Sequence, residues 1–247
     1  MRSSLIAGNW KMNGSLQSVI DLVEGIKVGD PGKAELAVCP PAVFLMKVGG
    51  MLAETGISLG AQNVCDQEAG AFTGEISAGM LKECGCRYAI VGHSERRALY
   101  LESDQLVAAR FSMALTAGII PILCVGETLD EREQGVTETV VARQIDAVLD
   151  LCGIAGIASA VIAYEPVWAI GTGKVATPEQ AQAVHAFIRA KLEQLDSSVA
   201  QRVQILYGGS MNPSNAAELL SQLDIDGGLI GGAALKADDF LAIAQSA

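Results

Sequence analysis

Three residues that can carry out acid–base or anion-binding chemistry each follow the end of a short apolar run. Lys11, His93 and Glu165 lie within a few residues of such an end. If the runs are parallel strands, their carboxyl ends meet at one edge of the fold, where α/β proteins bind ligands. The pattern therefore predicts one site that contains an amine, an imidazole and a carboxylate.

Glycine-rich segments follow two further runs near the end of the chain, at Gly208-Gly209-Ser210 and at Gly231-Gly232. Backbone N–H groups at such positions bind phosphate, and glycine lets the ligand approach closely. A single glycine more often only turns the chain, but two such loops together with a lysine favour a phosphate site. Gly171 to Ala176 also matches the dinucleotide pattern G-x-G-x-x-A. It begins five residues after Pro166 rather than at a strand end, so we interpret it as a mobile loop over the site.

Eight short apolar or β-branched runs recur along the chain. They are Ser4–Ala7, Glu35–Cys39, Ile57–Ala61, Tyr88–Val91, Ile119–Val125, Ala160–Ala163, Val203–Leu206 and Gly228–Ile230. Most are continuous rather than alternating, as expected for strands covered on both faces. Eight strand–helix units average about 31 residues each, which is close to the size of a (β/α)8 module. We predict an α/β fold with a single (β/α)8 barrel domain over residues 1–247. An open doubly wound sheet is the alternative that the strand count does not exclude.

Capping signals predict where three helices begin. Thr177-Pro178-Glu179-Gln180 combines an N-cap threonine with proline at the first helical position and glutamine at the third. Asn212-Pro213 repeats this signal, and Asp238-Asp239-Phe240 begins the last helix. We interpret His185, beside the apolar face of the first of these helices, as an ordinary surface or boundary residue. The predicted packed face of the second consists of Ala216, Leu219, Leu220 and Leu223.

The acidic composition argues against one large class of partners. The chain of 247 residues has 17 Lys+Arg against 28 Asp+Glu, a formal net charge of −11. Nucleic-acid binding depends on Lys and Arg that neutralise phosphates, so we do not expect DNA or RNA as a partner. Hydrophobic residues make up 50 % and charged residues 18 % of the chain, a balance typical of a folded globular protein.

The cysteines and the apolar segments indicate in which compartment the protein is expected. The six cysteines form no C-x-x-C pair and accompany no paired histidines, so we expect no metal site, and Cys39 and Cys124 are predicted to be buried thiols. The longest uncharged stretch, Leu151 to Tyr164, is shorter than the roughly 20 residues of a membrane-spanning helix. Lys11 interrupts the first apolar stretch, which is too short for a signal peptide. These features predict a cytoplasmic protein without membrane contact.

Four motifs together resemble the triosephosphate isomerase family. They are GNWKMNG at 8–14, VGHSERR at 91–97, YEPVWAIGTGK at 164–174 and YGGS at 207–210, and the likeness extends to GAFTGEIS at 70–77, CVGETL at 124–129 and IGGAAL at 230–235. The resemblance runs nearly from end to end. It implies a TIM barrel and an enzyme of glycolysis and gluconeogenesis. That enzyme interconverts D-glyceraldehyde 3-phosphate and dihydroxyacetone phosphate through an enediolate, with neither a metal nor an organic cofactor.

The resemblance also implies a division of the chemistry among four residues, which a fifth supports. Glu165 is the expected base that moves a proton between adjacent carbons. His93 is expected to polarise the carbonyl as a neutral ring at a helix start, an arrangement of which this family is itself a standard example. Lys11 is expected to balance the phosphate and the developing oxyanion, and Asn9 to hydrogen-bond a substrate oxygen. Glu95 is expected to contact these catalytic groups rather than the substrate.

Phosphate binding and the exclusion of water are implied by the same likeness. Gly171, Ser210 and Gly232 are expected to bind phosphate through backbone N–H groups, with Gly231 shaping the same loop. The segment Pro166–Ala176 resembles the family's lid, itself a standard example of a closing loop. Such a lid keeps water away from the enediolate, which otherwise loses phosphate.

A second subunit is implied by the segment Gly70–Glu75. It resembles the family's interlocking dimer loop, in which Thr73 reaches toward Asn9 and Lys11 of the other subunit. We therefore expect a homodimer.

Two other functions were weighed against the isomerase. A phosphosugar epimerase or aldolase on the same fold needs metal ligands or a Schiff-base lysine inside the barrel, whereas the chain has two histidines and Lys11 follows the asparagine and tryptophan. A phosphometabolite-binding barrel without turnover has no need of the full set of catalytic side chains. The residues favour the isomerase over both alternatives.

Overall fold

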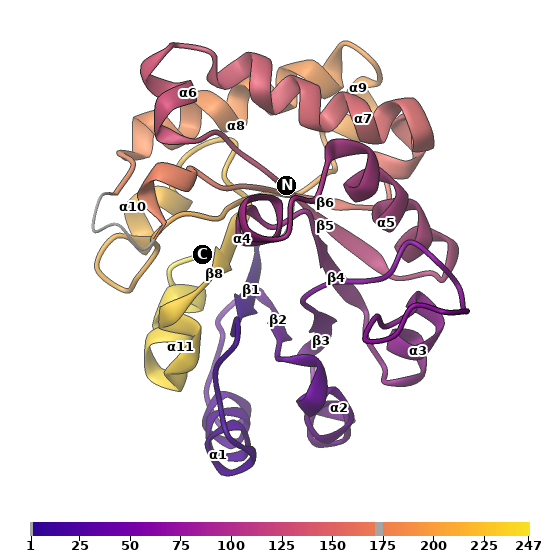
Figure 1. The fold of residues 1–247 in the computed structure, drawn as a ribbon. Coiled ribbons are helices and arrows are strands. Elements are labelled where there is room, and N and C mark those ends of the chain that lie inside the picture. Colours follow the sequence, from indigo (N-terminus) through magenta and orange to yellow (C-terminus); the bar gives the residue numbers. More distant parts are fainter. Residues whose placement is uncertain (1, 171–174) are drawn as a thin grey trace.

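The computed structural model describes residues 2–170 and 175–247, and its eight parallel strands close into a barrel in the order β1 to β8 (Figure 1). The strands are β1 Leu5–Asn9, β2 Glu35–Cys39, β3 Ser58–Ala61, β4 Tyr88–Val91, β5 Ile120–Val125, β6 Val161–Tyr164, β7 Ile205–Tyr207 and β8 Gly227–Ile230. Each pairs in parallel with its neighbours, and β1 closes the ring against β8. The predicted barrel is confirmed, and the open doubly wound sheet is excluded.

Helices follow the strands and form an outer layer around the barrel (Figure 1). The α-helices are α1 Leu16–Lys27, α2 Leu45–Leu52, α3 Ala78–Glu83, α4 Ser94–Leu99, α5 Asp104–Thr116, α6 Leu129–Glu133, α7 Thr137–Ile157, α8 Pro178–Glu193, α9 Ser197–Ala200, α10 Ala216–Leu220 and α11 Ala237–Gln245. Three short 3-10 helices are η1 Ala42–Phe44, η2 Val167–Ala169 and η3 Gly232–Leu235. None of the helices in the described ranges is long and apolar enough to cross a membrane.

The strands read as continuous apolar runs because both of their faces are buried. In β1, Leu5 and Ala7 belong to the cluster inside the barrel, whereas Ile6 belongs to the larger cluster between the barrel and the helices. Cys39 and Cys124 lie in the inner cluster and are fully buried, as predicted. Two packed layers of this kind remove the alternation that a half-exposed strand shows.

Capping chemistry explains one predicted helix start and corrects another. Thr177 caps α8 with a reciprocal pair, in which its hydroxyl accepts from the Gln180 N–H and the Gln180 side chain accepts from the Thr177 N–H. The signal at Asn212 is wrong as a helix start, because α10 begins at Ala216. The segment before α10 forms a single turn instead. The Asn215 side chain holds this turn, because its amide oxygen accepts from the Asn212 N–H at 2.8 Å and its amide nitrogen donates to the Ser210 carbonyl at 3.1 Å.

Two side chains lie elsewhere than predicted. Leu223, assigned to a packed face, lies beyond the end of α10 and is exposed. His185, interpreted as a surface or boundary residue, is 0 % exposed. It faces the barrel from α8, with the Tyr164 ring edge-on at a centroid distance of 5.8 Å. Whether His185 is buried depends on how α8 is rotated about its axis. The apolar pattern gives this rotation only approximately, so it does not show on which side of the boundary a residue beside the apolar face lies. The last helix begins at Ala237, next to the predicted Asp238.

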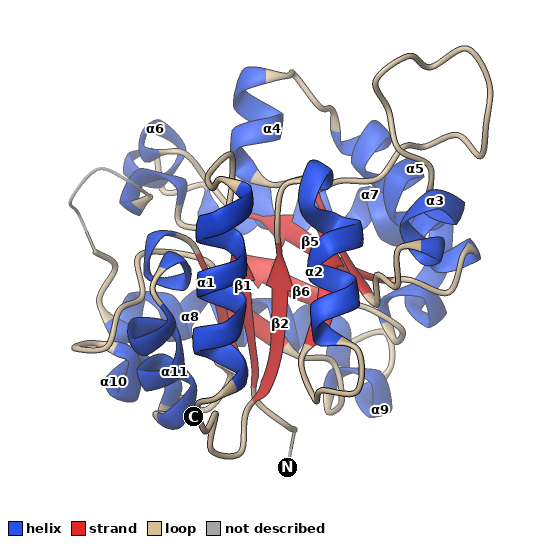
Figure 2. Ribbon diagram, turned by 90° about the horizontal axis from the view of Figure 1, so that it is seen from below, coloured by secondary structure: helices blue, strands red, loops and turns tan. Residues whose placement is uncertain are grey.

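All the predicted site residues in the described ranges lie at one end of the barrel. Figure 2 shows the arrowheads of β1 and β2 pointing toward the end that carries α4, while both chain termini lie at the opposite end. The carboxyl ends of the strands are the ligand-binding end of this architecture.

Candidate active site

A pocket of about 380 Å³ lies at the carboxyl ends of β1, β4, β7 and β8. Among the predicted site residues that line it are Asn9, Lys11, His93, Ser210, Gly231 and Gly232. Residues from both ends of the chain therefore meet in one cavity. Glu95 and Glu165 are not among the lining residues and contact it through Lys11 and His93. Gly171, predicted to bind phosphate, lies outside the described residues, as does the central part of the predicted lid.

The end of β1 presents Lys11 to this cavity by means of an unusual backbone conformation. Lys11 has a φ of +51°, in the left-handed region that a residue with a Cβ rarely adopts. The buried Asn9 side chain accepts a hydrogen bond from the Lys11 N–H at 3.0 Å, which holds this turn. The Lys11 ammonium pairs with Glu95, whose side chain is 43 % exposed. Glu95 thus pairs with the Lys11 ammonium without lining the pocket itself.

His93 follows β4 directly and caps α4. Its Nδ1 accepts a hydrogen bond from the Glu95 N–H at 3.2 Å, so the proton of the neutral ring lies on Nε2. Burial lowers the pKa of His93, but the nearby Glu165 carboxylate outweighs burial and raises that pKa above its ordinary value. Because Nδ1 already accepts from the Glu95 N–H, it cannot also carry a proton. The positive end of the α4 dipole also disfavours a positively charged ring. We therefore assign a neutral ring that donates from Nε2.

Glu165, directly after β6, is 2 % exposed and turned toward the start of α4. One carboxylate oxygen, Oε2, accepts from the Ser94 N–H at 2.9 Å, and Oε1 accepts from the Ser94 hydroxyl at 3.0 Å. His93 Nε2 also lies 3.0 Å from Oε1. Burial raises the pKa of Glu165, but His93 and the hydrogen bonds from Ser94 outweigh it, so the pKa lies below its ordinary value. The carboxylate is ionised and stands next to the pocket.

The ends of β7 and β8 offer bare backbone to the same cavity. The Ser210 hydroxyl donates to the Ala169 carbonyl at 2.9 Å, which ties this end of β7 to η2. A Cβ at Gly232 would meet no atom within 4 Å, and one at Gly231 would meet only the Lys11 side chain at 3.6 Å. The space in front of these two peptides is therefore open to a ligand. N–H groups in such a place favour an anion with several oxygens.

Known proteins with similar sequences belong to one family. The sequence profile described as triosephosphate isomerase matches residues 4–247. A triosephosphate isomerase of Dechloromonas aromatica (strain RCB) is 60 % identical over 248 residues that cover 100 % of both chains. That of Thiobacillus denitrificans (strain ATCC 25259 / T1) is 61 % identical over 247 residues, covering 100 % of this chain and 99 % of the relative.

The chain belongs to the triosephosphate isomerase family. Family membership confirms the resemblance that the four motifs carry, and the closed barrel confirms the fold that this resemblance implies. No group of three or more His, Cys, Asp or Glu side chains within residues 2–170 and 175–247 is arranged to hold a metal ion.

Two residues of this triosephosphate isomerase fold were missed by the sequence analysis as parts of the site. Ser94 holds both oxygens of Glu165. Glu127, 0 % exposed, accepts hydrogen bonds from Trp168 Nε1 at 2.9 Å and from the Tyr164 hydroxyl at 3.1 Å, and pairs with Arg132 at 3.0 Å. Glu127 thereby holds η2, which forms the first part of the predicted lid. A carboxylate two residues after the apolar run of β5 was the available signal, and the residue lies within the CVGETL motif.

Proposed function

We propose that this chain interconverts D-glyceraldehyde 3-phosphate and dihydroxyacetone phosphate with Glu165 as the base and His93 as the electrophile. The observation that carries the assignment of roles is the 3.0 Å approach of His93 Nε2 to Glu165 Oε1 beside a pocket that also contains Lys11 and open glycine backbone. A base and a hydrogen-bond donor that meet at one edge of a pocket can act on adjacent carbon and oxygen atoms of one substrate. Family membership supplies the reaction.

Glu165 performs the proton transfer in this scheme. Its carboxylate takes a proton from one carbon of the bound triose phosphate and returns it to the neighbouring carbon. The side chain is hydrogen-bonded to Ser94 and does not line the pocket, so it has to turn away from Ser94 to reach substrate. The same hydrogen bonds keep the base ionised before substrate arrives.

The remaining groups stabilise negative charge. His93 donates a hydrogen bond from Nε2 to the carbonyl oxygen, which stabilises the negative charge that develops there as the enediolate forms. We assign to Lys11 the positive charge that the phosphate and the oxyanion need, and to Asn9 a hydrogen bond with a substrate oxygen; both residues line the pocket, which supports these roles. We assign Ser210, Gly231 and Gly232 to phosphate binding through their backbone N–H groups. We propose the same role for Gly171, which lies outside the described residues.

A coupled assay tests the function. D-glyceraldehyde 3-phosphate is supplied, and dihydroxyacetone phosphate is followed through its NADH-dependent reduction, with and without EDTA. We expect rapid turnover that EDTA does not change. Folded protein without turnover would instead favour a binding protein, and loss of activity with EDTA would favour a metal-dependent barrel enzyme.

The variant Glu165→Gln tests the role of the base separately. An amide cannot take up the proton, so we expect kcat to fall by about 10²- to 10⁴-fold, the usual contribution of a general base. Binding of inorganic phosphate, measured by competitive inhibition in the wild type and by calorimetry in both proteins, should change little. Wild-type turnover in this variant would reject Glu165 as the base.

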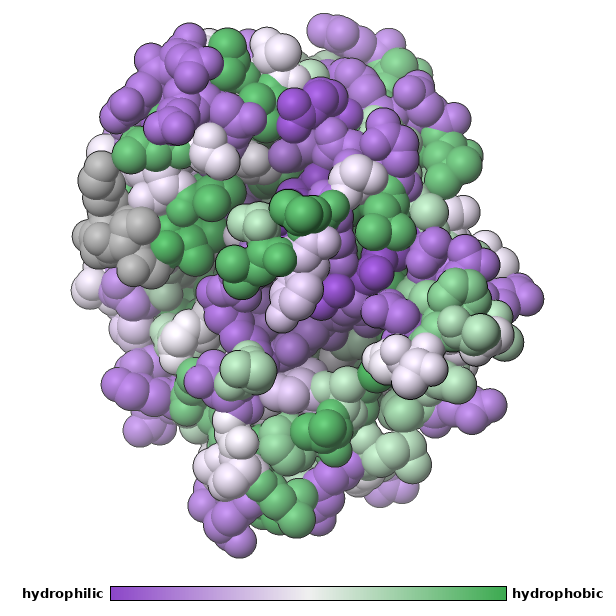
Figure 3. Space-filling view, viewed as in Figure 1, coloured by the Kyte–Doolittle hydropathy of each residue, from purple (hydrophilic) through white to green (hydrophobic). Residues whose placement is uncertain are grey.

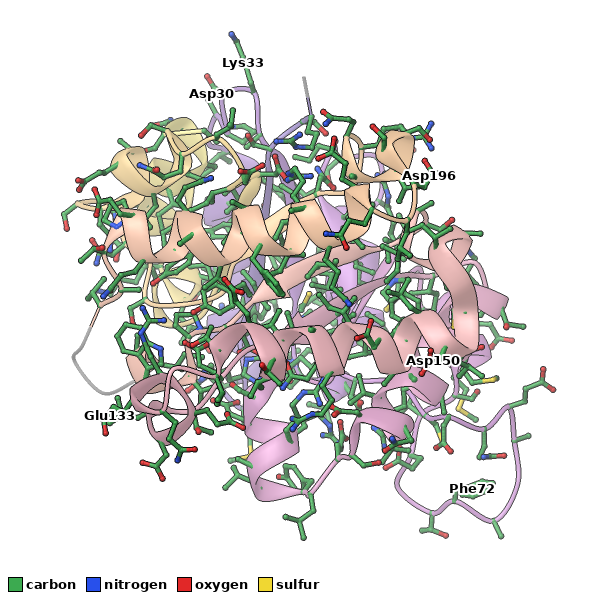
Figure 4. The ribbon with its side chains drawn as sticks, turned by 90° about the horizontal axis from the view of Figure 1, so that it is seen from above. Asp30, Lys33, Phe72, Glu133, Asp150 and Asp196 are labelled. Carbon is green, nitrogen blue, oxygen red and sulfur yellow. The ribbon has the colours of Figure 1, made fainter. Side chains whose placement is uncertain are left out.

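We also propose that the partner of the chain is a second copy of itself. Large exposed apolar side chains follow four consecutive strands, β1 to β4, on one side of the barrel mouth. They are Met12, Val43, Met46, Phe72, Leu99, Tyr100 and Leu101. Figure 3 has apolar groups at the surface near the middle of the face where Figure 1 places α4, and Figure 4 draws Phe72 on a loop that stands out from the body. Exposed apolar residues gathered in this way are typical of an interface.

The loop Gly70–Glu75 has the local structure needed to project into a partner. Gly70 and Gly74 have φ values of +130° and +97°, and the Phe72 and Glu75 N–H groups close tight turns within the loop. Light scattering at micromolar concentration should therefore give the mass of a dimer. We expect Phe72→Ser with Thr73→Arg to shift the mass toward a monomer, since a charge in a packed interface is costly. A wild-type chain that is only monomeric would contradict the proposal.

We propose further that residues 1–247 act as one domain in the cytoplasm. One closed barrel accounts for the strands, and the cysteines of the described residues are all free thiols, as in proteins of reducing compartments.

A further inference from the structure

The backbone of Glu165 rests directly on the peptide that follows β5. The Glu165 N–H donates to the Val125 carbonyl at 2.7 Å. A Cβ added to the next residue, Gly126, would lie 1.8 Å from the Glu165 carbonyl oxygen. This contact has no room for any side chain, so a displacement of Gly126 displaces Glu165.

One side chain from the outer helix layer holds Gly126 by both of its backbone groups. Gln144 lies on α7, which Figure 1 places outside the barrel beside β5 and β6, and it is 5 % exposed. Its amide oxygen accepts from the Gly126 N–H at 2.8 Å, and its amide nitrogen donates to the Gly126 carbonyl at 3.1 Å. Strand pairing between β5 and β6 ends at Val125 and Tyr164, so it uses neither group. The glutamine amide therefore takes the place of a neighbouring strand.

We propose that Gln144 is a positioning residue for the general base. It fixes Gly126 and, through the contact of the two backbones, the Glu165 peptide, which carries the side chain that has to turn toward the substrate. Gln144 does not line that pocket, and the two hydrogen bonds of its amide go to Gly126. Its effect is on the placement of the base, and a base misplaced by about 1 Å can cost about a hundredfold in rate.

The proposal predicts a selective loss of turnover. Phosphate is assigned to the ends of β7 and β8, and Gln144 contacts the end of β5 instead. The variant Gln144→Met keeps the length of the side chain and removes both hydrogen bonds. We expect kcat to fall by about ten- to a hundredfold, while the inhibition constant of inorganic phosphate changes by less than twofold.

Gln182 offers a matched control at the other end of the barrel. Its amide makes the same kind of paired contact, donating to an Asp224 carboxylate oxygen at 2.7 Å and accepting from the Asp224 N–H at 3.0 Å. Asp224 precedes β8 and so lies at the amino ends of the strands. Gln182→Met should lower the midpoint of thermal unfolding about as much as Gln144→Met does, and leave kcat within twofold of wild type.

Two outcomes would overturn the proposal. One is an equal kcat for folded Gln144→Met and Gln182→Met, which would make Gln144 merely structural. The other is a loss of phosphate affinity in parallel with kcat, which would mean general damage to the pocket. If Gln144→Met does not fold, Gln144→Asn, which keeps the amide but withdraws it by one methylene, is measured in the same way with the same two criteria.

The inference rests on Glu165 being the base, and the two can fail separately. An active wild type, an inactive Glu165→Gln and a fully active Gln144→Met would reject only the role of Gln144. An active Glu165→Gln would reject the base itself, whatever Gln144→Met does.

Discussion

Ser94 determines the resting state of Glu165, the proposed base. Its N–H and hydroxyl each donate to one oxygen of Glu165, and His93 lies within hydrogen-bond distance of Oε1 as well. These donors favour the charged form more strongly than burial disfavours it. The base is thus ionised in the free protein even though it is almost completely shielded from water. In the proposed mechanism the carboxylate stays charged until the bound substrate replaces Ser94 as its partner.

Ser94→Ala should therefore raise the pKa of Glu165 in the free enzyme. The variant removes the hydroxyl donor and keeps the N–H donor, so the charged form loses part of its stabilisation. We expect the acid limb of the pH profile of kcat/KM, which reports the free enzyme, to move to higher pH. Kinetics between pH 4 and 8 measure the shift.

Ser77→Ala is a suitable control for the removal of a buried hydroxyl. Ser77 caps α3, where its hydroxyl accepts from the Met80 N–H, and it has no contact with Glu165. Its acid limb should coincide with that of wild type. An unshifted limb in Ser94→Ala would mean that the hydroxyl does not stabilise the charged form of Glu165.

At the scale of elements, capping explains why one helix start was predictable and another was not. Thr177 and Asn212 both precede a proline, and the residue three positions on from each reaches back to its N–H. At Thr177 the backbone continues into α8. At Asn212 the amide of Asn215 also donates to the Ser210 carbonyl and holds a separate turn before α10. The contact with Ser210 depends on where β7 ends in space, and the local sequence pattern does not contain this information.

The Thr177 cap gives a prediction at this scale. Thr177→Ala leaves the N–H of Gln180 without its side-chain acceptor, so we expect a loss of about 1 kcal/mol in the free energy of unfolding. Thr177→Ser restores the hydroxyl and should recover most of that loss. Urea unfolding at one fixed protein concentration measures both, because association adds to apparent stability. Equal stability of the two variants would contradict the role of the hydroxyl.

The strands and the site differ in how far the sequence predicts them. The strands were predictable because both faces are buried, which gives continuous apolar runs. The placement of Lys11, His93 and Glu165 at one end of the barrel was predictable because all three follow strand ends. The hydrogen bonds from Ser94 to Glu165 join residues that are 71 positions apart in the sequence. Gln144 contacts Gly126 from the middle of a long helix with no local signal. Such contacts depend on side-chain directions that only the closed barrel defines.

At the scale of the whole molecule, a buried histidine links stability to pH. His185 is fully buried between α8 and the barrel, and its Nδ1 lies 3.1 Å from the Asp224 carbonyl, to which it donates. Burial lowers the pKa of His185 to about 4, and the Arg189 guanidinium adds to this, while the contacts with Asp224 oppose it. The ring is therefore neutral in the folded protein at every pH above this value.

The sign of the resulting pH dependence follows from the two pKa values. In the unfolded chain the ring takes up its proton near pH 6.5, whereas in the folded protein it does so only near pH 4. Between these values the unfolded chain binds more protons, so acid favours unfolding. The contribution of His185 is complete above pH 6.5 and is lost as the pH falls toward 4. About 2 kcal/mol of it is gone by pH 5.

His185→Asn isolates this contribution from that of the carboxylates. An asparagine amide can still donate to the Asp224 carbonyl, but it does not titrate. The variant is expected to be less stable than wild type at pH 7, and the difference in unfolding free energy between the two proteins should shrink by about 2 kcal/mol between pH 7 and pH 5. Urea unfolding at both pH values, at one protein concentration, measures the change. A difference that stays constant would show that His185 binds no additional proton on unfolding, because the other titrating groups are common to both proteins and cancel.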